Sequence, residues 1–204
     1  MVRERIVVLI SGSGSNLQAL VGACQRRDVP GYVAGVVADR PCAGLEWAAA
    51  NNIPWLLVEP GSFASRDDWS RAMRDRVLEV QADLVVSAGF MRILAPVFVD
   101  GYFGRLINLH PSLLPAFPGA HAVRDALAAG VKITGSTVHY VDHLVDHGPI
   151  IMQEPVRIED GDTEVSLHER IKAVEHVMLP TVCGLMLENR VRLQQGRTWI
   201  QNAY

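Results

Sequence analysis

Short runs of β-branched residues alternate with stretches of helical pattern over the first 110 residues, and this rhythm constrains the fold more than any other feature of the chain. Nearly continuous apolar runs are typical of strands that are buried on both faces. Because helical stretches separate the runs, the pattern predicts parallel strands joined by crossover helices. The expected strands are residues 6–10, 33–38, 55–58, 84–88 and 106–109.

Three longer stretches predict helices. Residues 16–27 and 66–81 repeat apolar side chains at helical spacing, so each would bury one face. A long third helix is expected to open at Asp162 or Thr163, which are both good N-caps. Pro180 lies inside that helix and is expected to kink it.

The pattern changes after residue 130. Residues 133–141 and 149–158 read as two long strands separated by a short loop, which favours an antiparallel extension of the sheet. The 204 residues, 49% of them hydrophobic, suffice for one large core, and no linker or repeat marks a second domain. The sequence therefore predicts a single α/β domain over 1–204, a Rossmann-like open sheet with a parallel N-terminal part, an antiparallel C-terminal extension and helices on both faces.

Charge and cysteine content limit the partners of the chain. Its 19 basic and 22 acidic residues give a net charge of -3, the wrong sign for a protein whose affinity comes from nucleic-acid phosphates. The 3 cysteines form no CxxC pair, so neither a disulfide framework nor a zinc ribbon is indicated. The apolar run near the N-terminus is too short for a signal peptide or a membrane span. We expect a cytoplasmic protein that binds small molecules and neither nucleic acid nor membrane.

The sequence SGSGSNLQAL at residues 11–20 follows the first expected strand and opens the first expected helix. Glycines let a ligand approach the backbone and free N–H groups at a helix N-terminus favour an anion, so this turn predicts a phosphate cradle. A dinucleotide fingerprint would need glycine in place of Leu17, although Asp39 could imitate its ribose-binding acid. A P-loop would need Gly-Lys-Ser/Thr, which is absent. The alternative is a plain turn capped by Asn16.

Asn108 and His110 lie two residues apart in the fifth expected strand, so their side chains point to the same face. They stand at the carboxyl end of that strand, where open α/β sheets bind ligands. Pro111, Pro115 and Pro118 would hold the following chain in a stiff, extended turn. The pair predicts a two-pronged polar site, and the alternative is a buried Asn and His that satisfy backbone groups.

The segment HYVDHLVDHGPII supplies Asp142 and Asp146 as acidic partners for the imidazole. On a helix, its histidines at 139, 143 and 147 would share one face and could bind a metal. The flanking strands and the following Gly-Pro favour a loop instead. We therefore predict no metal.

Several motifs together resemble the folate-dependent formyltransferases. They are INLHPSLLP at 107–115, Asp-His-Gly-Pro at 146–149, SGSGSNLQAL, AGFMRIL at 88–94 and VEHVMLP at 174–180. The similarity covers nearly the whole chain and is greatest to members that act on glycinamide ribonucleotide. It implies transfer of a formyl group from 10-formyltetrahydrofolate, as co-substrate, to the amine of that ribonucleotide in purine synthesis.

The resemblance also implies catalytic roles. Asn108 and a protonated His110 would donate hydrogen bonds to the oxyanion that forms when the amine attacks the formyl carbon. Asp146 would keep His110 protonated and take the proton of the amine through water; otherwise it is a turn residue. The neighbouring His147 stands where the family usually has a small residue, and it either perturbs Asp146 or faces solvent.

For the ribonucleotide, the resemblance implies that Gly14, Ser15 and Asn16 hold the phosphate and that Glu175 holds the substrate. Lys172, at a position that varies in the family, would add charge to the phosphate. The alternative for Lys172 and Glu175 is an ion pair on the helix surface.

For the folate, the resemblance implies an apolar pterin slot lined by AGFMRIL and closed by the loop over 142–146. Arg66, at the start of the helix over 66–81, would reach a glutamate carboxylate of the folate. The alternatives are that Met91 and Leu94 belong to the core and that Arg66 is only exposed. The implied folate-binding residues are Arg66, Met91, Arg92, Ile93, Leu94, Asn108, Asp142 and Asp146.

Three other functions fit parts of the pattern. The relative that formylates initiator methionyl-tRNA shares the Asn-His-Asp core but would need an RNA-binding domain and a basic surface. A formyltetrahydrofolate hydrolase would carry a regulatory N-terminal domain and lack the GSGSN turn. A nucleotide-binding module without catalysis is the alternative from another class. The resemblance further implies that the peptide bond between Leu114 and Pro115 could be cis.

Overall fold

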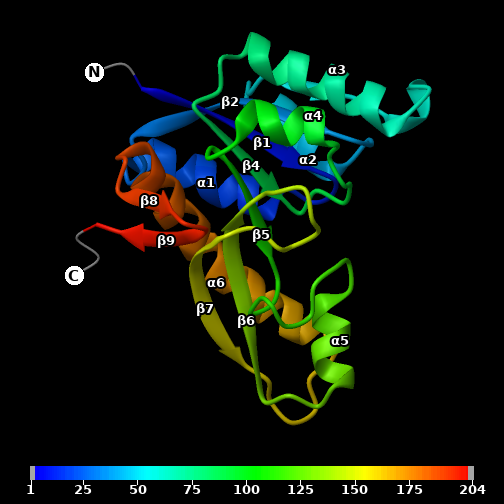
Figure 1. The fold of residues 1–204 in the computed structure, drawn as a ribbon. Coiled ribbons are helices and arrows are strands. Elements are labelled where there is room, and N and C mark those ends of the chain that lie inside the picture. Colours follow the sequence, from blue (N-terminus) through cyan, green and yellow to red (C-terminus); the bar gives the residue numbers. More distant parts are fainter. Residues whose placement is uncertain (1–2, 202–204) are drawn as a thin grey trace.

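A seven-stranded mixed sheet forms the middle of the computed structural model, which describes residues 3–201 (Figure 1). Its strands are β1 (Glu4–Ile10), β2 (Gly31–Ala38), β3 (Trp55–Leu57), β4 (Leu84–Ala88), β5 (Leu106–His110), β6 (Ile133–Tyr140) and β7 (Ile150–Arg157). They lie in the order β3-β2-β1-β4-β5-β6-β7. Pairing is parallel from β3 to β5 and antiparallel from β5 to β7. The predicted parallel sheet with an antiparallel C-terminal extension is therefore confirmed.

Helices and one hairpin complete the described chain. The α-helices are α1 (Ser15–Arg26), α2 (Ala43–Ala50), α3 (Arg66–Glu79), α4 (Pro96–Val99), α5 (Ala122–Ala128) and α6 (Glu164–Leu187). Short 3-10 helices are η1 (Pro60–Ser62) and η2 (Asp100–Tyr102), and the hairpin pairs β8 (Val191–Gln194) with β9 (Arg197–Ile200). No helix within residues 3–201 is both long and apolar enough to cross a membrane.

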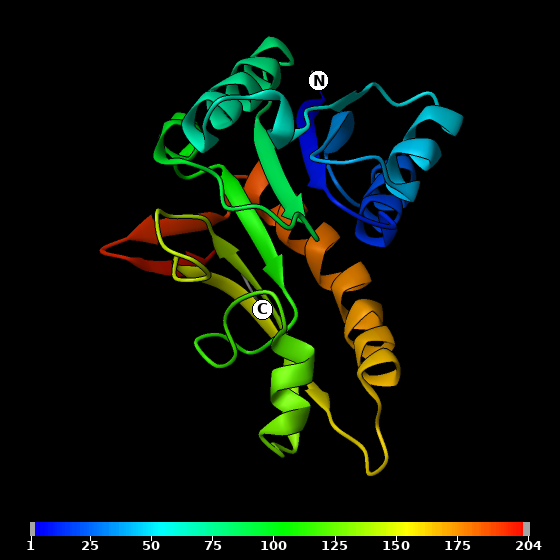
Figure 2. The ribbon, with the colours of Figure 1, turned by 90° about the vertical axis from the view of Figure 1, so that its right-hand side faces the viewer.

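The two faces of β1 explain why helices cover both sides of the sheet. Ile6, Val8 and Ile10 belong to the core cluster that contains residues of α1, α2 and α6. Val7 and Leu9, which alternate with them, belong to a second cluster with residues of α3 and α4. All five side chains are fully buried. Figure 2 shows the sheet between these two helical layers, so the predicted helices on both faces are confirmed.

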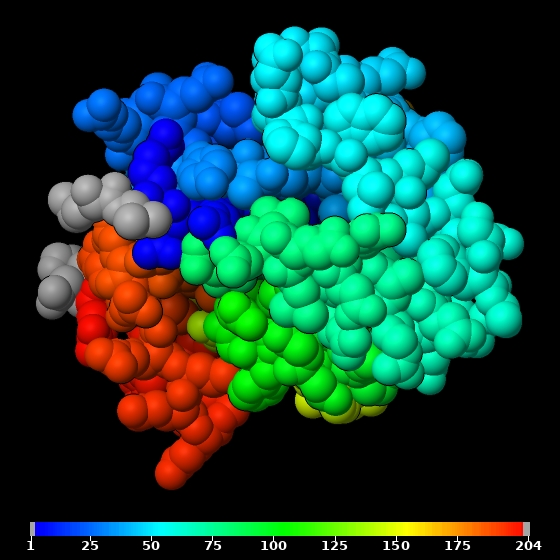
Figure 3. Space-filling view, turned by 90° about the horizontal axis from the view of Figure 1, so that it is seen from above, coloured from blue at the N-terminus to red at the C-terminus, as the bar shows by residue number. Residues whose placement is uncertain are grey.

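The end of α6 brings the C-terminal part of the chain against the N-terminal part. A Cβ atom on Gly31 would lie 2.8 Å from Leu187 Cδ1, so the start of β2 nearly touches the last turn of α6. In Figure 3 the orange C-terminal segment accordingly lies beside the blue N-terminal segments, with the cyan and teal region of α3 on the opposite side. This packing joins both halves of the sequence in one core.

The three expected helices exist with small shifts at their ends. Thr163 caps α6 through a reciprocal box, because its hydroxyl accepts the Ser166 N–H while the Ser166 hydroxyl accepts the Thr163 N–H. The helix continues through Pro180, and the kink there stays a prediction.

Three helices and the hairpin were not predicted. The short α2 and α5 are rich in alanine, and α4 has only 4 residues, so none of them shows a clear helical period. The hairpin turns at Gln195 and Gly196, both at positive φ, between strands of only 4 residues.

Candidate active site

Three side chains of the predicted catalytic group meet at the carboxyl end of β5. Asn108 and His110 project from one face of the strand, and Asp146 reaches them from the loop that joins β6 to β7. Asp146 Oδ1 lies 3.5 Å from Asn108 Nδ2, and Asp146 Oδ2 lies 3.4 Å from His110 Nδ1. The Gly119 N–H donates to Asp146 Oδ2 at 2.7 Å. The fold thus brings an amide, an imidazole and a carboxylate together.

His139 of β6 is a fourth member of this group. It is paired with Asn108 in the antiparallel register, so the two side chains are direct neighbours. His139 Nδ1 faces the Tyr140 carbonyl oxygen at 2.8 Å, and its Nε2 faces Asn108 Nδ2 at 3.2 Å and Asp146 Oδ1 at 3.8 Å. The sequence prediction treated His139 only as a metal-ligand candidate. Its role depends on the register of β5 and β6, for which the sequence pattern gives no signal.

The Asp146 carboxyl is held in its charged form. Burial raises its pKa, but the contacts with His139 and the Gly119 amide and the charges of His110 and His139 outweigh that effect. The pKa of Asp146 is therefore below its ordinary value. A carboxylate that stays ionised can accept protons and attract a cationic imidazole.

The two expected oxyanion donors already have acceptors in the protein. His110 Nε2 faces the Phe117 carbonyl oxygen at 2.8 Å, while its Nδ1 lies 3.4 Å from Asp146 Oδ2. The Asn108 amide nitrogen faces His139 and Asp146. Buried donors normally find such partners. Donation to a substrate oxygen therefore requires one of these bonds to be exchanged.

The proline-rich turn after His110 is fixed to the antiparallel strands. The Leu114–Pro115 bond is cis, which confirms the expectation from the resemblance. The Leu114 N–H donates to Thr137 Oγ1 in β6 at 3.1 Å, and Gln153 Nε2 in β7 donates to the Leu114 carbonyl oxygen at 2.9 Å. The turn that carries Phe117 and Gly119 is thereby held beside the catalytic group.

The loop at 141–149 approaches its own supporting strand very closely. A Cβ atom on Gly148 would lie 1.8 Å from the Tyr140 carbonyl oxygen, so only glycine fits there. Asp146 itself has φ +51°, in the left-handed region that residues other than glycine rarely adopt. The position of the carboxylate thus depends on a tightly constrained loop.

The glycine-rich turn and α6 meet at a buried carboxylate. Gly14, with φ +74°, precedes α1, and a Cβ atom on it would lie 2.9 Å from Gly44 Cα. Asn16 Nδ2 donates to Glu175 Oε2 at 2.9 Å, and Ser136 Oγ donates to Glu175 Oε1 at 3.1 Å. The alternative of an Asn16 cap is wrong, because Gly14 is the N-cap of α1 and makes no side-chain cap bond.

This arrangement separates the residues implied for the ribonucleotide into two sets. Gly14, Ser15 and Asn16 lie at the start of α1, and Asn16 contacts Glu175, which is 4% exposed rather than paired on a helix surface. Lys172 Nζ instead pairs with Glu169 Oε1 at 2.8 Å. A phosphate contact of Lys172 stays a prediction.

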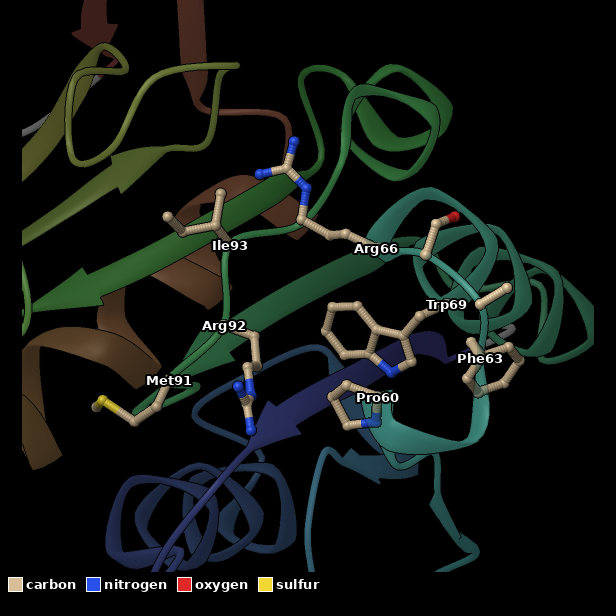
Figure 4. Close-up of a pocket in the computed structure, with 9 residues that line it drawn as sticks. Pro60, Phe63, Arg66, Trp69, Met91, Arg92 and Ile93 are labelled. Carbon is tan, nitrogen blue, oxygen red and sulfur yellow. The ribbon is translucent and has the colours of Figure 1, made fainter.

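An open pocket of about 560 Å³ gathers four of the eight residues implied for the folate (Figure 4). Its lining includes Arg66, Met91, Arg92 and Ile93, together with Pro60, Phe63 and Trp69. Figure 4 shows Arg66 extending from the start of α3 toward Ile93, with Trp69 and Pro60 across the pocket. A cation thus stands beside aromatic and aliphatic side chains, a combination that suits an aromatic ligand with a carboxylate.

The structure places the other four folate candidates, Leu94, Asn108, Asp142 and Asp146, outside the lining of this pocket. Leu94 is half-buried against the core of α3 and α4, which agrees with the alternative of a core residue. Asp142 and Asp146 lie in the loop beyond β6 and are not part of the lining. The closure of the pocket by this loop stays a prediction.

Asp39 is engaged by two arginines that face the same end of the sheet. Arg40 Nη2 lies 2.7 Å and Arg92 Nε lies 2.8 Å from its Oδ2. Burial raises the pKa of Asp39, but bonds from Arg40, Ser11 and Arg92 hold it below its ordinary value. Because this carboxylate is already bonded to protein groups, it is poorly suited to imitate a ribose-binding acid.

Metal ligation finds no support in the described part of the chain. No group of three or more His, Cys, Asp or Glu side chains within residues 3–201 is placed to hold a metal ion. His143 instead lies 2.7 Å from Asp100, and His147 lies 2.7 Å from Asp142.

Known proteins are similar to this chain in sequence and in fold. Residues 4–183 match the formyl transferase family model. A phosphoribosylglycinamide formyltransferase of Mycobacterium tuberculosis (strain CDC 1551 / Oshkosh) is 48% identical over 194 residues, covering 95% of this chain and 89% of the relative. The protein of that name from Escherichia coli (strain K12) is 40% identical, covering 96% and 92%.

The fold comparison agrees. The crystal structure of glycinamide ribonucleotide transformylase 1 from Symbiobacterium toebii superposes with a TM-score of 0.96 at 42% identity, covering 98% of this chain and 95% of that one. The mixed sheet, the polar group at the end of β5 and the matched sequences lead to one assignment. The chain belongs to the formyl transferase family and is a formyltransferase enzyme.

Proposed function

We propose that the enzyme transfers the formyl group of 10-formyltetrahydrofolate to the amine of glycinamide ribonucleotide, a step of purine (IMP) biosynthesis. The observation that carries this proposal is the convergence of Asn108, His110 and Asp146, with distances of 3.4 and 3.5 Å from the carboxylate to the other two groups. The names of the relatives from Mycobacterium tuberculosis and Escherichia coli support the choice of substrate. A cytoplasmic location and one domain over 1–204 complete the proposal.

The chemistry needs no protein nucleophile, because an amine can attack a formyl carbon directly. The 10-formyltetrahydrofolate supplies that carbon, the new bond forms to the amine nitrogen, and the bond to the folate nitrogen breaks. Asn108 and His110 would donate to the oxygen that gains negative charge, each exchanging one of its present acceptors. Asp146 would accept the proton lost by the amine through water, and the folate nitrogen would take up a proton.

The ribonucleotide would lie between α1 and α6. Backbone N–H groups at Gly14 and Ser15 suit a phosphate at the start of α1, and Asn16 presents a buried side-chain oxygen for which residues 3–201 supply no hydrogen-bond partner. Glu175 would accept from hydroxyl or amine groups of the substrate. Lys172 would add charge at the phosphate after leaving Glu169.

The folate would lie with its glutamate end in the open pocket. Arg66 would pair with a carboxylate there, while Met91, Arg92 and Ile93 line the path toward β5. Leu94 would support that path from the core, and the loop with Asp142 and Asp146 would close over the pterin. The partners in this proposal are small molecules, with no nucleic acid, membrane or metal.

One spectroscopic assay tests the proposal against its alternatives. We expect loss of 10-formyltetrahydrofolate absorbance that depends on added glycinamide ribonucleotide. Loss without the amine would instead identify a formyltetrahydrofolate hydrolase, and no loss would identify a nucleotide-binding module. A matched assay with initiator methionyl-tRNA in place of the ribonucleotide tests the alternative that the enzyme formylates this tRNA.

A single substitution tests the proposed mechanism. Asp146→Asn keeps an oxygen for the Gly119 N–H but removes the charge, so we expect turnover to fall by about 10²-fold or more in a folded protein. The measurement is kcat with both substrates, with thermal unfolding as the folding control. Turnover near that of the parent enzyme would contradict the role given to Asp146.

A further inference from the structure

Two histidine–aspartate pairs fasten the loop that carries Asp146, and the proposed chemistry uses neither histidine. His143 Nε2 lies 2.7 Å from Asp100 Oδ1, which ties the loop to η2. His147 Nδ1 lies 2.7 Å from Asp142 Oδ2, which joins the two ends of the loop to each other. In Figure 1 the loop follows β6 and lies below α4. The two pairs have equal lengths but connect different parts of the molecule.

The Asp142 carboxylate has a partner on each oxygen. Its Oδ1 accepts the Leu144 N–H at 2.9 Å, an Asx turn that fixes the first half of the loop. Its Oδ2 faces His147, so the same carboxylate also fixes the second half. Residues 142–147 are therefore closed into a ring by side-chain bonds, and Asp146 is the residue next to the closing bond.

Asp146 requires a restraint of this kind. Its φ of +51° is unfavourable for a residue with a side chain, and a conformation of this type persists only where the surroundings impose it. On its C-terminal side, Gly148 packs against the Tyr140 carbonyl oxygen, which fixes the chain there. The bond between His147 and Asp142 supplies a second restraint from the loop itself.

We propose that His147 is a positioning residue whose bond to Asp142 holds Asp146 in the conformation that directs its carboxylate at His110 and Asn108. This inference rests on the proposed function of Asp146. It gives the Asp142 side chain a task inside the loop. His147 does not touch the reacting atoms in this scheme and acts only through Asp142.

The exposure of the pair determines which measurement reports its role. The side chains of His147 and Asp142 are 66% and 29% exposed, and exposed pairs contribute little to overall stability. Loss of the bond should therefore leave the unfolding temperature nearly unchanged. The effect should appear in kcat, because a misdirected carboxylate lowers the rate of the chemical step while substrate binding persists.

Two substitutions at one position separate the bond from the bulk of the side chain. His147→Ala removes the donor, and we expect kcat to fall about fivefold, the scale of one hydrogen bond, with KM for the ribonucleotide within about twofold. His147→Asn keeps a nitrogen donor near the place of Nδ1, and we expect it to restore kcat to within about twofold of the parent. In an Asp142→Ala background, His147→Ala should have no further effect, because the same bond is already lost.

His143→Ala is the matched control, because it removes a pair of equal length from the same loop. We expect kcat within about twofold of the parent for this variant. A loss in His143→Ala equal to that in His147→Ala would overturn the inference in favour of general loop anchoring. An unchanged kcat in His147→Ala, or no recovery with His147→Asn, would also overturn it.

Hydrogen exchange of the Leu144 amide gives a readout that does not depend on catalysis. Release of Asp142 in His147→Ala should make this exchange at least about threefold faster, and His143→Ala should leave it unchanged. Unchanged exchange in His147→Ala would contradict the closed ring. If the parent enzyme transferred no formyl group, the proposed function would fail, while this exchange measurement would still decide whether His147 fixes the loop.

Discussion

The proposed catalytic group at the end of β5 and the open pocket beside α3 are built in opposite ways. In the first, side chains from paired strands are almost fully buried, and His110 and His139 are 4% and 2% exposed. In the second, loop residues form the wall, and Met91 and Ile93 are 57% and 54% exposed. Paired strands and one tightly constrained loop fix the side chains of the first region, whereas the open loops of the second leave a surface that can adapt to a ligand. Substitutions in the first region should lower kcat, and those in the second should raise KM.

Loss of the Asn108 amide should give the largest effect. Asn108→Ala removes the donor at the end of β5, and we expect kcat to fall about 10²- to 10³-fold, as for other lost oxyanion donors. KM for both substrates should change by less than about threefold, because the donor acts on charge that develops during the reaction. Steady-state kinetics measures both values. A large rise in KM with unchanged kcat would remove the contrast between the regions.

A substitution in the loop backbone should have the next largest effect. Gly148→Ala forces a Cβ atom against the Tyr140 carbonyl oxygen, at 1.8 Å before relaxation, so the loop and Asp146 must move. We expect kcat to fall about 10²-fold and the free energy of unfolding to fall by about 1–3 kcal/mol. Kinetics and urea unfolding measure these changes.

The control for this glycine is Gly184 of α6. A Cβ atom there would lie 3.5 Å from the Asp28 carbonyl oxygen, which is an ordinary contact. Gly184→Ala should therefore keep full activity and equal or greater stability, since alanine favours a helix. If Gly148→Ala behaved like Gly184→Ala, the close approach at Tyr140 would not constrain the site.

A substitution in the open pocket should have a smaller effect, and that effect should appear in KM and not in kcat. Arg66→Ala removes the cation at the start of α3, and we expect KM for 10-formyltetrahydrofolate to rise about tenfold with kcat within about twofold. Arg71→Ala, at an exposed arginine of the same helix, is the matched control and should leave both values unchanged. Equal effects of the two substitutions would show that general charge, rather than the pocket, attracts the folate.

The same contrast explains how much of the fold the sequence predicted. Strong periodicity and β-branched runs identified all seven strands of the large sheet, and the pattern is clearest in strands such as β1 and β4 that are buried on both faces. The hairpin of β8 and β9 was missed, because its strands are short and carry an exposed Trp199 that gives no burial signal. Helix α2 was missed because alanines have no marked polar and apolar faces.

Some residues of the candidate site could likewise be predicted from the sequence, and others could not. Asn108 and His110 could be predicted to share a face from strand alternation alone, whereas the pairing with Asp146 came from resemblance, since no local rule joins residues 38 positions apart. His139 required the register of β5 and β6, which the sequence pattern does not specify. The sequence offered Glu175 as the ion-pair partner of Lys172, whereas the structure pairs Lys172 with Glu169.

The smallest expected effect concerns the pH dependence of stability and tests whether the charge in the buried group belongs to Asp146. Because its pKa is lowered in the folded state, Asp146 contributes stability that is present above its unfolded pKa of about 3.9 and is lost as pH falls through the folded value. Relative to Asp146→Asn, the parent should therefore lose unfolding free energy as the pH falls below about 4. Urea unfolding of both proteins above and below this pH measures the difference, in which the other acidic groups largely cancel. A difference that stays flat down to about pH 3 would mean that His110 and His139 do not stabilise the carboxylate, and the buried region would then lack the electrostatic coupling that sets it apart from the open pocket.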